Sequence, residues 1–427
     1  MPDAHQCRSG FDDHRNSDRT TSTFAPTCIL GRIDLDLVVV GGAGHVGLPL
    51  ALAFASTGLR VGIYDIDANA VAGIRAGEMP FAEHGAPELL AEVLAAQRLE
   101  VDTDAAMLER SDTIVIVIGT PIDEFLNPKL SMLRDALRQL VPHIQNGSLV
   151  VLRSTVFPGT TELVAETLRA AGKRVDVAMC PERILEGHAL EELRSLPEII
   201  GADDDVAADR AARLFQRLQP RTVRVSAREA EIAKLLTNTW RYMKFAIANQ
   251  FFMLAHGSGI DYGNVLRAIK QDYPRAADLP GPGFAAGPCL LKDTMQLASF
   301  APDHFPLGHS AMQINEGLPS YIVSAMERRF GPLRGRAIGI LGMAFKAESD
   351  DPRASLSYKL RRLLLWAGAD VLCADPHVKG DGIVGLERVI RESEVLVLGV
   401  PHQAYRALNL DPRCLVDVWG ALGPINV

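Results

Sequence analysis

The residues that could do chemistry begin with one cysteine, Cys289, which follows a loop rich in glycine and proline. Lys292 and Asp293 come shortly after it. The glycines let the backbone approach a ligand closely, and the prolines hold the loop in one shape. A thiol presented in this way can act as a nucleophile if a positive neighbour such as Lys292 or Lys234 lowers its pKa. The alternative is that Cys289 is a small buried apolar residue, and its loop alone does not decide between the two.

A second group of residues predicts dinucleotide binding. An apolar strand-like run over 35–40 leads into the sequence Gly-Ala-Gly-His-Val-Gly and then into a helix-like run over 48–57. The next strand-like run ends at Asp65, whose carboxylate would bind the adenosine ribose and repel a 2′-phosphate. This pattern favours NAD over NADP, whereas the alternative is a glycine-rich turn that only packs a helix on a sheet. The predicted cofactor residues here are Gly42, Gly44, His45, Val46, Gly47 and Asp65.

Polar residues also follow three further predicted strands. Thr120 follows the run 113–118 and Thr155 follows 149–152, while Glu182 and Arg183 follow 175–179. Ligands of doubly wound sheets bind at this edge. Glu182 is a candidate acid or base and Arg183 a candidate phosphate or sugar contact. The alternatives are ordinary turn residues for the threonines and a surface ion pair for Glu182 and Arg183.

A long helical pattern runs from about residue 228 to 256. Lys234, Asn238 and Arg241 share one face of it by their spacing. This face is either solvated or functional. Apolar residues predicted to be buried occupy the opposite face: Ile232, Leu235, Leu236, Met243 and Ala246. A helix of this length between two α/β units predicts a central spine and a homodimer interface.

The last part of the chain predicts a second Rossmann-like unit without a GxGxxG turn. Its strands are predicted over 336–341, 370–374, 395–400 and 415–417. The fold class is therefore α/β, with two Rossmann-like doubly wound domains joined by a long central helix in an all-α middle domain. We predict a disordered tail over 1–30, an NAD-binding Rossmann domain over 31–225, a central helical domain over 226–330 and a Rossmann-like domain over 331–427 that could bind another nucleotide.

The net charge and the cysteine pattern indicate which partners and which cellular compartment to expect. The 427 residues carry a formal net charge of −8, which argues against nucleic acid or an anionic membrane as a partner. The six cysteines form no CxxC pair, so a disulfide framework or zinc site is not indicated and a reducing cytoplasm is expected. Residues 1–30 are polar and lack the apolar segment of a signal peptide. The apolar run 37–59 is long enough to span a membrane, but its glycines fit a strand, turn and helix better.

From about Asp34 onward the chain resembles the UDP-glucose/GDP-mannose dehydrogenase family. The motifs that carry this resemblance are Gly42–Gly47 with Asp65, Gly119-Thr120-Pro121, Ser154-Thr155 with Pro158-Gly159-Thr160, Pro181-Glu182-Arg183, Lys234 with Asn238, Gly283 to Cys289 with Lys292-Asp293, and Phe345-Lys346 with Asp351, Arg353 and Ser355. Pro181-Glu182-Arg183 resembles the branch that acts on UDP-N-acetylhexosamines, whereas the run from Cys289 to Asp293 resembles the UDP-glucose branch. Ala286 departs from the family, which often has a glycine there.

The resemblance implies a four-electron oxidation of a sugar C6 alcohol to a carboxylate, with two NAD⁺ and no metal. Cys289 would attack the C6 aldehyde to give a thiohemiacetal and then a thioester. Lys234, Asn238 and a water would stabilise the oxyanion, Asp293 and Thr155 would hold that water, and Glu182 would assist hydrolysis. Whether the first base is Lys234 or a water held by Asp293 stays open.

The resemblance also implies that the domain over 331–427 binds the UDP-sugar, and it implies further ligand contacts. Thr120, Thr155 and Arg353 would contact the cofactor. The implied substrate contacts are Arg183, Ile184, Lys234, Asn238, Arg241, Tyr273, Arg275, Gly283, Phe345 and Lys346.

The predicted function is therefore NAD-dependent oxidation of a UDP-sugar, with UDP-N-acetylmannosamine or UDP-N-acetylglucosamine as the expected substrate. The product uronate would serve polysaccharide biosynthesis. UDP-glucose is the alternative substrate. Two other classes are a two-electron dehydrogenase related to 3-hydroxyacid dehydrogenases, which needs no cysteine, and a nucleotide-sugar binding protein without turnover.

Overall fold

The larger of two sheets forms the first half of the fold. The computed structural model describes residues 34–120, 122–123, 128–129 and 131–427, so the predicted tail over 1–30 and Pro121 lie outside the described residues. The strand order is β3-β2-β1-β4-β5-β6-β7-β8. Strands β1 to β6 run parallel in the doubly wound order, and β7 is antiparallel to β6. The strands are β1 (Leu37–Val40), β2 (Val61–Tyr64), β3 (Leu99–Asp102), β4 (Thr113–Ile116), β5 (Leu149–Leu152), β6 (Asp176–Met179), β7 (Glu198–Gly201) and β8 (Thr222–Val225).

The central strands of this sheet are buried on both faces. All four residues of β1 are buried, as expected for a parallel strand covered by helices on either side. Val39 pairs in register with Ile63 of β2 and Val115 of β4. The register brings the ends of these three strands to one edge of the sheet, where the polar residues of the predicted site follow.

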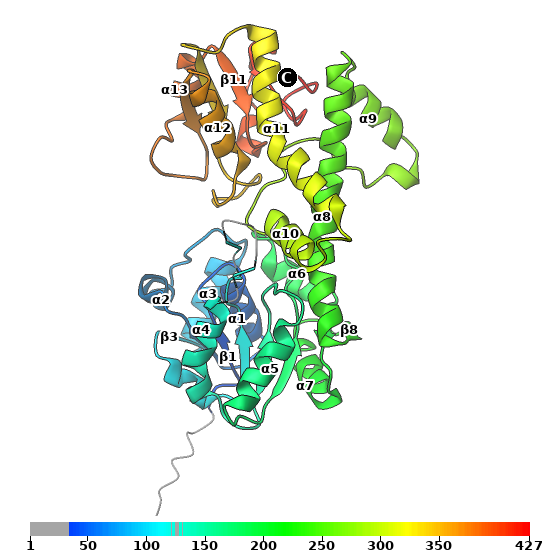
Figure 1. Ribbon diagram of the computed structural model, residues 1–427. Helices are drawn as coiled ribbons and strands as arrows, with labels where there is room; N and C mark the ends of the chain where they lie inside the picture. Colours follow the sequence, from blue (N-terminus) through cyan, green and yellow to red (C-terminus); the bar gives the residue numbers. More distant parts are fainter. Residues whose placement is uncertain (1–33, 121, 124–127, 130) are drawn as a thin grey trace, which may run out of the picture. The chain divides into compact units, whose positions relative to one another are not determined.

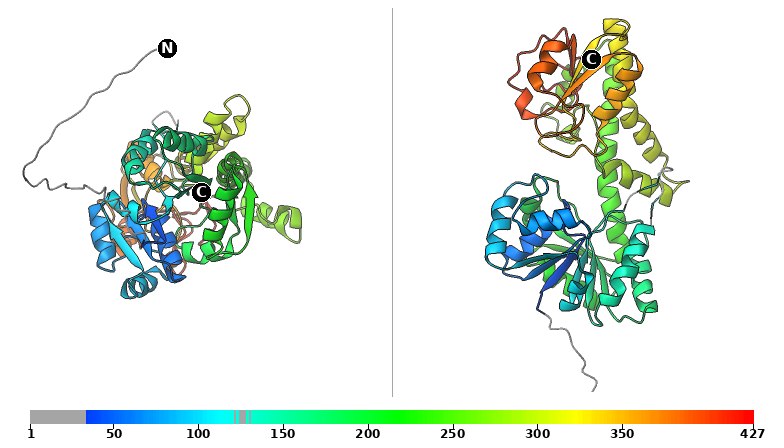
Figure 2. Two further views of the ribbon diagram at one scale, coloured as in Figure 1. Left: turned by 90° about the horizontal axis from the view of Figure 1, so that it is seen from below. Right: turned by 90° about the vertical axis from the view of Figure 1, so that its left-hand side faces the viewer.

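Helices lie on both sides of the large sheet (Figure 2). They are α1 (Gly47–Ser56), α2 (Ala68–Arg75), α3 (Ala86–Ala95), η1 (Ala105–Arg110), α4 (Ser131–Leu140), η2 (Val141–His143), α5 (Thr160–Ala170), α6 (Ala189–Ser195) and α7 (Asp205–Phe215). Nine of the ten residues of α1 are buried, which explains why the sequence is apolar from the strand through the helix. Among the described helices, none has the length and apolar character needed to cross a membrane.

The long helix α8 (Ala227–Gly257) begins at a capping box formed by Ser226 and Glu229. It contacts both α10 (Leu290–Phe300) and α11 (Pro306–Phe330), and Figure 1 shows α10 beside its middle. The short elements α9 (Tyr262–Lys270) and η3 (Pro274–Ala276) lie between α8 and α10 in the sequence.

The predicted faces of α8 are partly wrong. Leu236, expected to be buried, is 50% exposed, whereas Leu235 and Ala246 are buried as expected. Lys234 and Asn238 are buried instead of solvated, because α10 packs over that side of the helix. The polar pair therefore lies inside the protein, where an unpaired charge is costly and a functional role is favoured.

A second, smaller sheet has the order β10-β9-β11-β12, with all neighbours parallel. Its strands are β9 (Ala337–Leu341), β10 (Asp370–Ala374), β11 (Val395–Leu398) and β12 (Leu415–Val416). Ile338 and Ile340 of β9 share one core with Leu318 of α11 and Leu360 of the next helix, α12 (Leu356–Trp366). The remaining elements are α13 (Leu386–Glu392) and η4 (Gln403–Tyr405).

The α/β fold class with a long central helix is confirmed. Strand β3, which closes one edge of the large sheet, and strands β7 and β8, which extend the other, were not among the predicted elements. The bounds of the four predicted segments stay predictions.

Candidate active site

The glycines of the turn after β1 have three different surroundings. A Cβ on Gly42 would lie 2.8 Å from the Ile63 side chain, and a Cβ on Gly47 would lie 2.5 Å from the Gly42 Cα. Gly44 has no atom within 4 Å of such a position. Gly42 and Gly47 are therefore needed for internal packing, while Gly44 leaves an open backbone surface beside His45 and Val46. A pyrophosphate requires this kind of surface at the start of a helix.

Asp65 follows β2 and faces the same turn. Its carboxylate accepts hydrogen bonds from the backbone N–H of Ala43 at 2.9 Å and of Asp67 at 3.0 Å. A carboxylate has about four acceptor positions, so these two bonds leave capacity for ribose hydroxyl groups. The turn and Asp65 together fit a dinucleotide with a free 2′-hydroxyl.

Cys289 lies immediately before α10, and its side chain is exposed. One helical turn later, Asp293 is fully buried against α8. Asn238 Nδ2 donates to Asp293 Oδ2 at 2.5 Å, and Lys292 Nζ pairs with Asp293 Oδ1 at 2.7 Å. The buried carboxylate of Asp293 thus joins the predicted residues of α8 to those of α10.

The surrounding protein shifts the pKa values of both Cys289 and Lys234. Cys289 is accessible at the surface, but the protein packed around its sulfur desolvates the thiolate. This desolvation and the Asp293 carboxylate raise the pKa of the Cys289 thiol. Lys292 and Lys234 act on the thiol in the predicted direction, because their charges lower its pKa, but desolvation and the Asp293 carboxylate outweigh them. Burial lowers the pKa of Lys234, which makes this amine easier to deprotonate than an exposed lysine.

The ends of β4 and β5 are tied to α10. The Thr120 hydroxyl donates to the Thr155 carbonyl oxygen, and Lys292 Nζ lies 3.4 Å from Thr120 Oγ1. Gln296 Nε2 donates to the Thr120 carbonyl oxygen at 3.3 Å. Gln296 was not predicted, although its position one turn after Lys292 on the same helix could have indicated it.

Glu182 lies in a buried ion-pair network. Its Oε1 accepts from the backbone N–H of Arg183 at 2.7 Å and of Ile184 at 3.0 Å, and its Oε2 pairs with Arg153 Nη2 at 2.6 Å. Arg153 is 1% exposed and also pairs with Glu198. The alternative of a surface ion pair is thus wrong for Glu182. Nothing in the sequence distinguishes Arg153 from other residues that follow a strand.

The side chain of Arg183 donates to the Pro197 carbonyl oxygen. This contact turns the guanidinium toward the chain's own backbone, and Ile184 is half-buried beside it. The predicted substrate contacts of these two residues stay a prediction.

Residues of the second sheet's loops reach the same region. A Cβ on Gly287, where φ is +105°, would lie 2.6 Å from the Phe345 ring. Lys346 Nζ donates to the Glu186 carbonyl oxygen, and burial lowers the pKa of Lys346. Arg353 pairs with Asp351 at 2.6 Å and lies 3.7 Å from the Glu186 carboxylate. Cys289 is among the groups whose charge acts on Arg353, so this guanidinium lies near the cysteine region.

The loop before Cys289 is held at Gly283. Its backbone N–H and carbonyl bond to the side chain of Asn249, at 2.9 and 3.0 Å. A Cβ on Gly283, where φ is +149°, would lie 2.3 Å from the Trp419 ring. Neither Asn249 nor Trp419 was predicted, because each lies far from the loop in sequence.

Three further predicted substrate residues are exposed at the surface. Arg241 is exposed on α8, although its charge acts on Lys234 and Lys346. Tyr273 is 45% exposed, and Arg275 stacks on its ring at 4.9 Å. No hydrogen bond, ion pair or ring contact among the described residues joins Tyr273 or Arg275 to Cys289. Their roles stay predictions.

Three protein-family models match the chain in succession. Residues 36–219 match the NAD binding domain of the UDP-glucose/GDP-mannose dehydrogenase family, residues 228–317 match its central domain, and residues 339–424 match its UDP binding domain. The matched segments contain the glycine turn, the α8 and α10 residues and the Phe345–Arg353 loop, respectively.

Individual relatives are similar over most of the chain. The UDP-N-acetyl-D-mannosamine dehydrogenase of Pyrococcus horikoshii is 34% identical over 385 residues, which cover 87% of this chain and 91% of the relative. The NDP-N-acetyl-D-galactosaminuronic acid dehydrogenase of Ralstonia nicotianae is 30% identical, over 91% and 96%. The structure of a UDP-glucose dehydrogenase from Pyrobaculum islandicum matches with a TM-score of 0.85 and 32% identity, over 92% and 96% of the two chains.

Proposed function

This chain belongs to the UDP-glucose/GDP-mannose dehydrogenase family, and we propose that it oxidises the C6 alcohol of a UDP-N-acetylhexosamine to a carboxylate. It is an NAD-dependent nucleotide-sugar dehydrogenase, so the predicted family, enzyme class and cofactor are confirmed. The names of the similar relatives and the Pro181-Glu182-Arg183 sequence favour an acetamido sugar over glucose. When bound, NAD⁺ supplies the acceptor for the two electrons released at each oxidation.

The observation that carries the proposal is an accessible thiol, Cys289, beside a buried lysine and a buried carboxylate. We propose that the Cys289 Sγ adds to the C6 aldehyde carbon while the carbonyl oxygen takes up a proton, which gives a thiohemiacetal. Loss of a hydride and a proton from this adduct leaves a thioester. Water then attacks the thioester carbonyl, the C–S bond breaks, and the carboxylate and the free thiol result.

Lys234 is proposed to stabilise the oxygen of the reacting carbon and to exchange its proton. Its lowered pKa suits proton exchange, and its position on a rigid helix suits stabilisation of negative charge. Asn238 donates to Asp293 at 2.5 Å, which holds both side chains in place. Asn238 and a water are proposed to help Lys234 stabilise this oxygen, and Asp293 and Thr155 are proposed to hold that water.

Glu182 is the proposed group for assisting thioester hydrolysis. Its charge acts on Lys234, which supports a position near the reacting atoms. The buried pair with Arg153 fixes its carboxylate. Arg153 is therefore a positioning residue in this proposal.

The nucleotide-sugar contacts are proposed to come from both sheets' loops. Phe345 would pack against an apolar face of the ligand, and Lys346 would meet its diphosphate. Arg353 is proposed to meet the charge of the cofactor. The other proposed substrate contacts are Arg183, Ile184, Lys234, Asn238, Arg241, Tyr273, Arg275 and Gly283.

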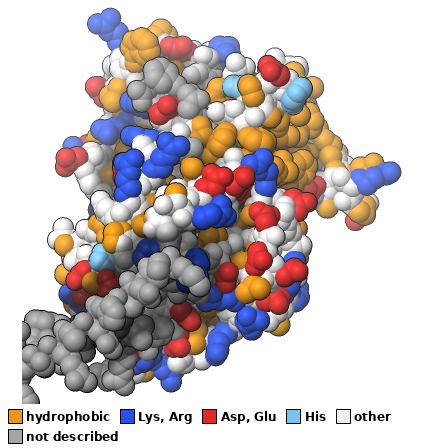
Figure 3. Space-filling model, turned by 60° about the horizontal axis from the view of Figure 1, so that its bottom comes forward, with side chains coloured by type: hydrophobic (Ala, Val, Ile, Leu, Met, Phe, Trp, Pro, Cys, Tyr) orange, Lys and Arg blue, Asp and Glu red, His pale blue; other side chains and the backbone are white. Residues whose placement is uncertain are grey.

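We also propose a homodimer formed through α8. Its exposed apolar side chains recur at helical spacing, as one stripe would: Leu236, Trp240, Ile247, Phe251 and Leu254. Figure 3 shows that exposed hydrophobic side chains gather in one area of the face that it draws. A helix face of this kind favours a partner over solvent. Light scattering should give twice the chain mass, and Trp240→Glu with Leu254→Glu should give the single mass.

A reducing cytoplasm suits the proposed thiol chemistry. Cys180, Cys289, Cys373 and Cys414 are all free in the described part of the chain. We propose that the uronate product enters polysaccharide biosynthesis.

The test counts NADH formed per sugar consumed, with purified protein, NAD⁺ and one nucleotide sugar at a time. UDP-N-acetylmannosamine, UDP-N-acetylglucosamine, UDP-N-acetylgalactosamine and UDP-glucose are compared. Two NADH per acetamido sugar is the expected result, and one NADH would overturn the four-electron reaction. Cys289→Ala should form no uronate, while Cys414→Ala, which changes another exposed free thiol, should keep full activity. A Cys289→Ala protein with full activity would overturn the role of the thiol.

A further inference from the structure

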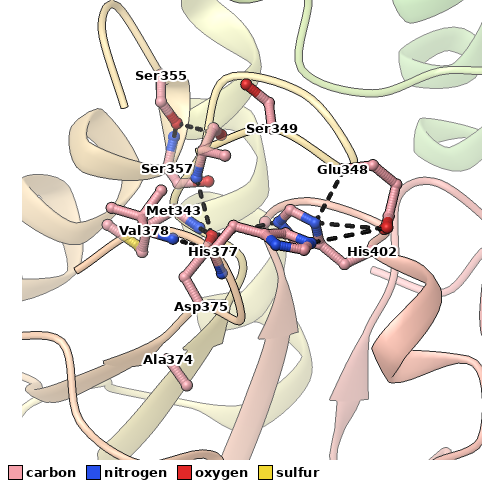
Figure 4. A network of polar contacts seen from close by, with 12 residues as sticks. Met343, Glu348, Ser349, Ser355, Ser357, Ala374, Asp375, His377, Val378 and His402 are labelled. Carbon is pink, nitrogen blue, oxygen red and sulfur yellow. Dashed lines mark hydrogen bonds and ion pairs between the residues drawn. The ribbon is translucent and has the colours of Figure 1, made fainter. Parts of the chain in front are cut away.

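A group of metal-ligand side chains lies at the carboxyl edge of the second sheet, apart from the cysteine site. Glu348 comes from the loop after β9, His377 follows β10 and His402 follows β11 (Figure 4). One potential ligand atom from each residue lies within 4.8 Å of the other two. The three residues are far apart in sequence, so the parallel sheet brings them together.

His402 is oriented as a metal ligand would be. It is fully buried, and its Nε2 lies 3.2 Å from the Asp375 carboxylate. Its Nδ1 accepts a hydrogen bond from the Glu348 backbone N–H at 3.1 Å, which places the ring proton on Nε2. A carboxylate that holds the far nitrogen of an imidazole is typical of metal-binding histidines, because it fixes both ring orientation and tautomer.

The gap between the three ligand atoms has the size of a coordination site. Glu348 Oε1 is 3.6 Å from His402 Nδ1, and Glu348 Oε2 is 3.7 Å from His377 Nε2. These distances are too long for good hydrogen bonds. Two ligand bonds of about 2.1 Å at a tetrahedral angle would separate the ligand atoms by about 3.4 Å. The two imidazole rings are tilted by 56° instead of stacked, so both can present a nitrogen to one point.

The surrounding charges also suit a divalent cation. In the ion pairs of the described residues, Glu348 meets only the two imidazoles and no lysine or arginine. With neutral histidines, the carboxylates of Glu348 and Asp375 would balance a charge of +2. Imidazole nitrogens together with one carboxylate favour zinc-like ions over calcium or magnesium, which prefer oxygen ligands.

We propose that Glu348, His377 and His402 bind a divalent transition-metal ion of the Zn²⁺ class, with Asp375 orienting His402. The ion replaces the Glu348 backbone N–H at His402 Nδ1, and this N–H turns to solvent, since Glu348 is exposed. Gln403 N already donates to Glu348 Oε1 at 2.7 Å and keeps the carboxylate at the site. Glu348 and His377 are both exposed, so the ion can enter directly.

The site would steady the loop that carries two proposed ligand contacts. Glu348 lies between Lys346 and Arg353, and Asp350 on the same loop accepts from the Ala82 backbone N–H at 3.1 Å. An ion that joins Glu348 to the ends of β10 and β11 restrains this loop. It takes no part in the oxidation, so its loss should raise the KM for the nucleotide sugar and leave kcat unchanged.

The test uses untagged full-length protein that has been dialysed against EDTA and then titrated with Co²⁺. The expected result is one equivalent with visible ligand-field absorption, displaced by Zn²⁺. His377→Gln and Glu348→Gln should each weaken this binding at least tenfold, while His304→Gln, an exposed histidine between α10 and α11, should not. Circular dichroism checks that the variants fold.

The absence of a Co²⁺ band would overturn the proposal. So would a band of equal affinity in His377→Gln, because the ion would then bind elsewhere in the chain. An equal loss in His304→Gln would do the same. None of these readouts depends on the sugar substrate, so the proposed oxidation can fail without affecting them.

Discussion

The two sheets repeat one local arrangement, a strand, a turn, and an acid at the end of the neighbouring parallel strand. In the large sheet these are β1, the turn at Gly42–Gly47 and Asp65, and in the small sheet they are β9, the turn at Gly342–Ala344 and Asp375. Both acids accept hydrogen bonds from backbone N–H groups of the turn: Asp65 from Ala43, and Asp375 from Met343 and Ala344.

The two acids nevertheless have different surroundings. Asp65 is half-buried and makes two backbone bonds, whereas the Asp375 side chain is fully buried and bonds to four backbone N–H groups and His402. Gly44 faces open space, while a Cβ on Gly342 would lie 2.6 Å from Val400. The same sheet edge is therefore open for a ligand in the first unit and filled by the protein itself in the second. The order of the strands determines where each acid lies. The atoms around it determine whether it can bind a ligand, as at Asp65, or bonds only to the protein itself, as at Asp375.

The largest effect is expected on the free energy of unfolding, when Asp375 of the small sheet is replaced. Asp375→Ala leaves several buried N–H groups without an acceptor and should lower the free energy of unfolding by about 4 kcal/mol. Asp65→Ala should lower it by less than about 1 kcal/mol, because its site is open to water. Urea unfolding followed by circular dichroism compares them. Equal losses would contradict the distinction between the two acids.

The Asp375 carboxyl group should also make the stability of the fold depend on pH. Although burial opposes it, hydrogen bonds from His402 and backbone amides hold the pKa of Asp375 well below its ordinary value. A carboxyl group with a lowered folded-state pKa stabilises the fold above its unfolded pKa, and this contribution is lost as the pH falls below about 4. Wild-type stability should therefore fall more steeply below pH 4 than that of Asp375→Ala.

Gly44 in the turn after β1 and Gly342 in the turn after β9 form a second pair that can be compared. Gly342 has a φ of +98° as well as the close contact with Val400, so Gly342→Ala should destabilise the fold by about 3 kcal/mol. Gly44→Ala should leave stability within about 0.5 kcal/mol but weaken NAD⁺ binding, because the added methyl group enters the open surface. Thermal unfolding and cofactor titration measure the two effects. Normal NAD⁺ affinity in Gly44→Ala would place the pyrophosphate elsewhere.

A smaller effect is expected at Asp65. Asp65→Asn removes a charged acceptor for the ribose hydroxyls and should weaken NAD⁺ binding by about 10- to 30-fold, or about 1.5 to 2 kcal/mol. Discrimination against NADP⁺ should fall at the same time. The KM for the nucleotide sugar should stay constant and serves as the internal control. A change in that KM alone would show that Asp65 does not face the cofactor.

The smallest effect concerns Cys289, whose charge acts on Arg353 from the second unit. Since the pKa of the thiol is raised, its alkylation rate should rise by roughly tenfold per pH unit through neutrality, without levelling off below pH 9. Inactivation by iodoacetamide at several pH values measures this, and Cys289→Ser is the control for other sites. A plateau near pH 7 would mean that the nearby cations outweigh burial.

The sequence predicted most of what depends on neighbours in the chain. The glycine turn with Asp65 is a local pattern, and helical spacing correctly put Lys234 and Asn238 on one side of α8. Strands β5 and β10 have the predicted bounds. These features depend on periodicity and turn geometry, which the sequence expresses directly.

Features that depend on distant segments were not predicted. The burial of Arg153 requires Glu182 and Glu198 from two other strands. The raised pKa of Cys289 depends mainly on how much protein surrounds it, which the sequence does not show. The group at Glu348, His377 and His402 is formed by the ends of three parallel strands. The exposed side of α8 was misassigned at Leu236, because the sequence does not show which faces receive α10 and α11.

The contact between Gly283 and Trp419 has a consequence for the order in which the protein matures. During synthesis the Cys289 loop leaves the ribosome well before Trp419, so the indole ring that packs on Gly283 is still missing. Asn249 is already present and can bond to Gly283, but the loop has no wall on its other side. The loop that carries the reactive thiol therefore acquires its final support only after the second sheet has been translated and folded. A nascent or prematurely terminated chain should bind dinucleotide without having an assembled nucleophile.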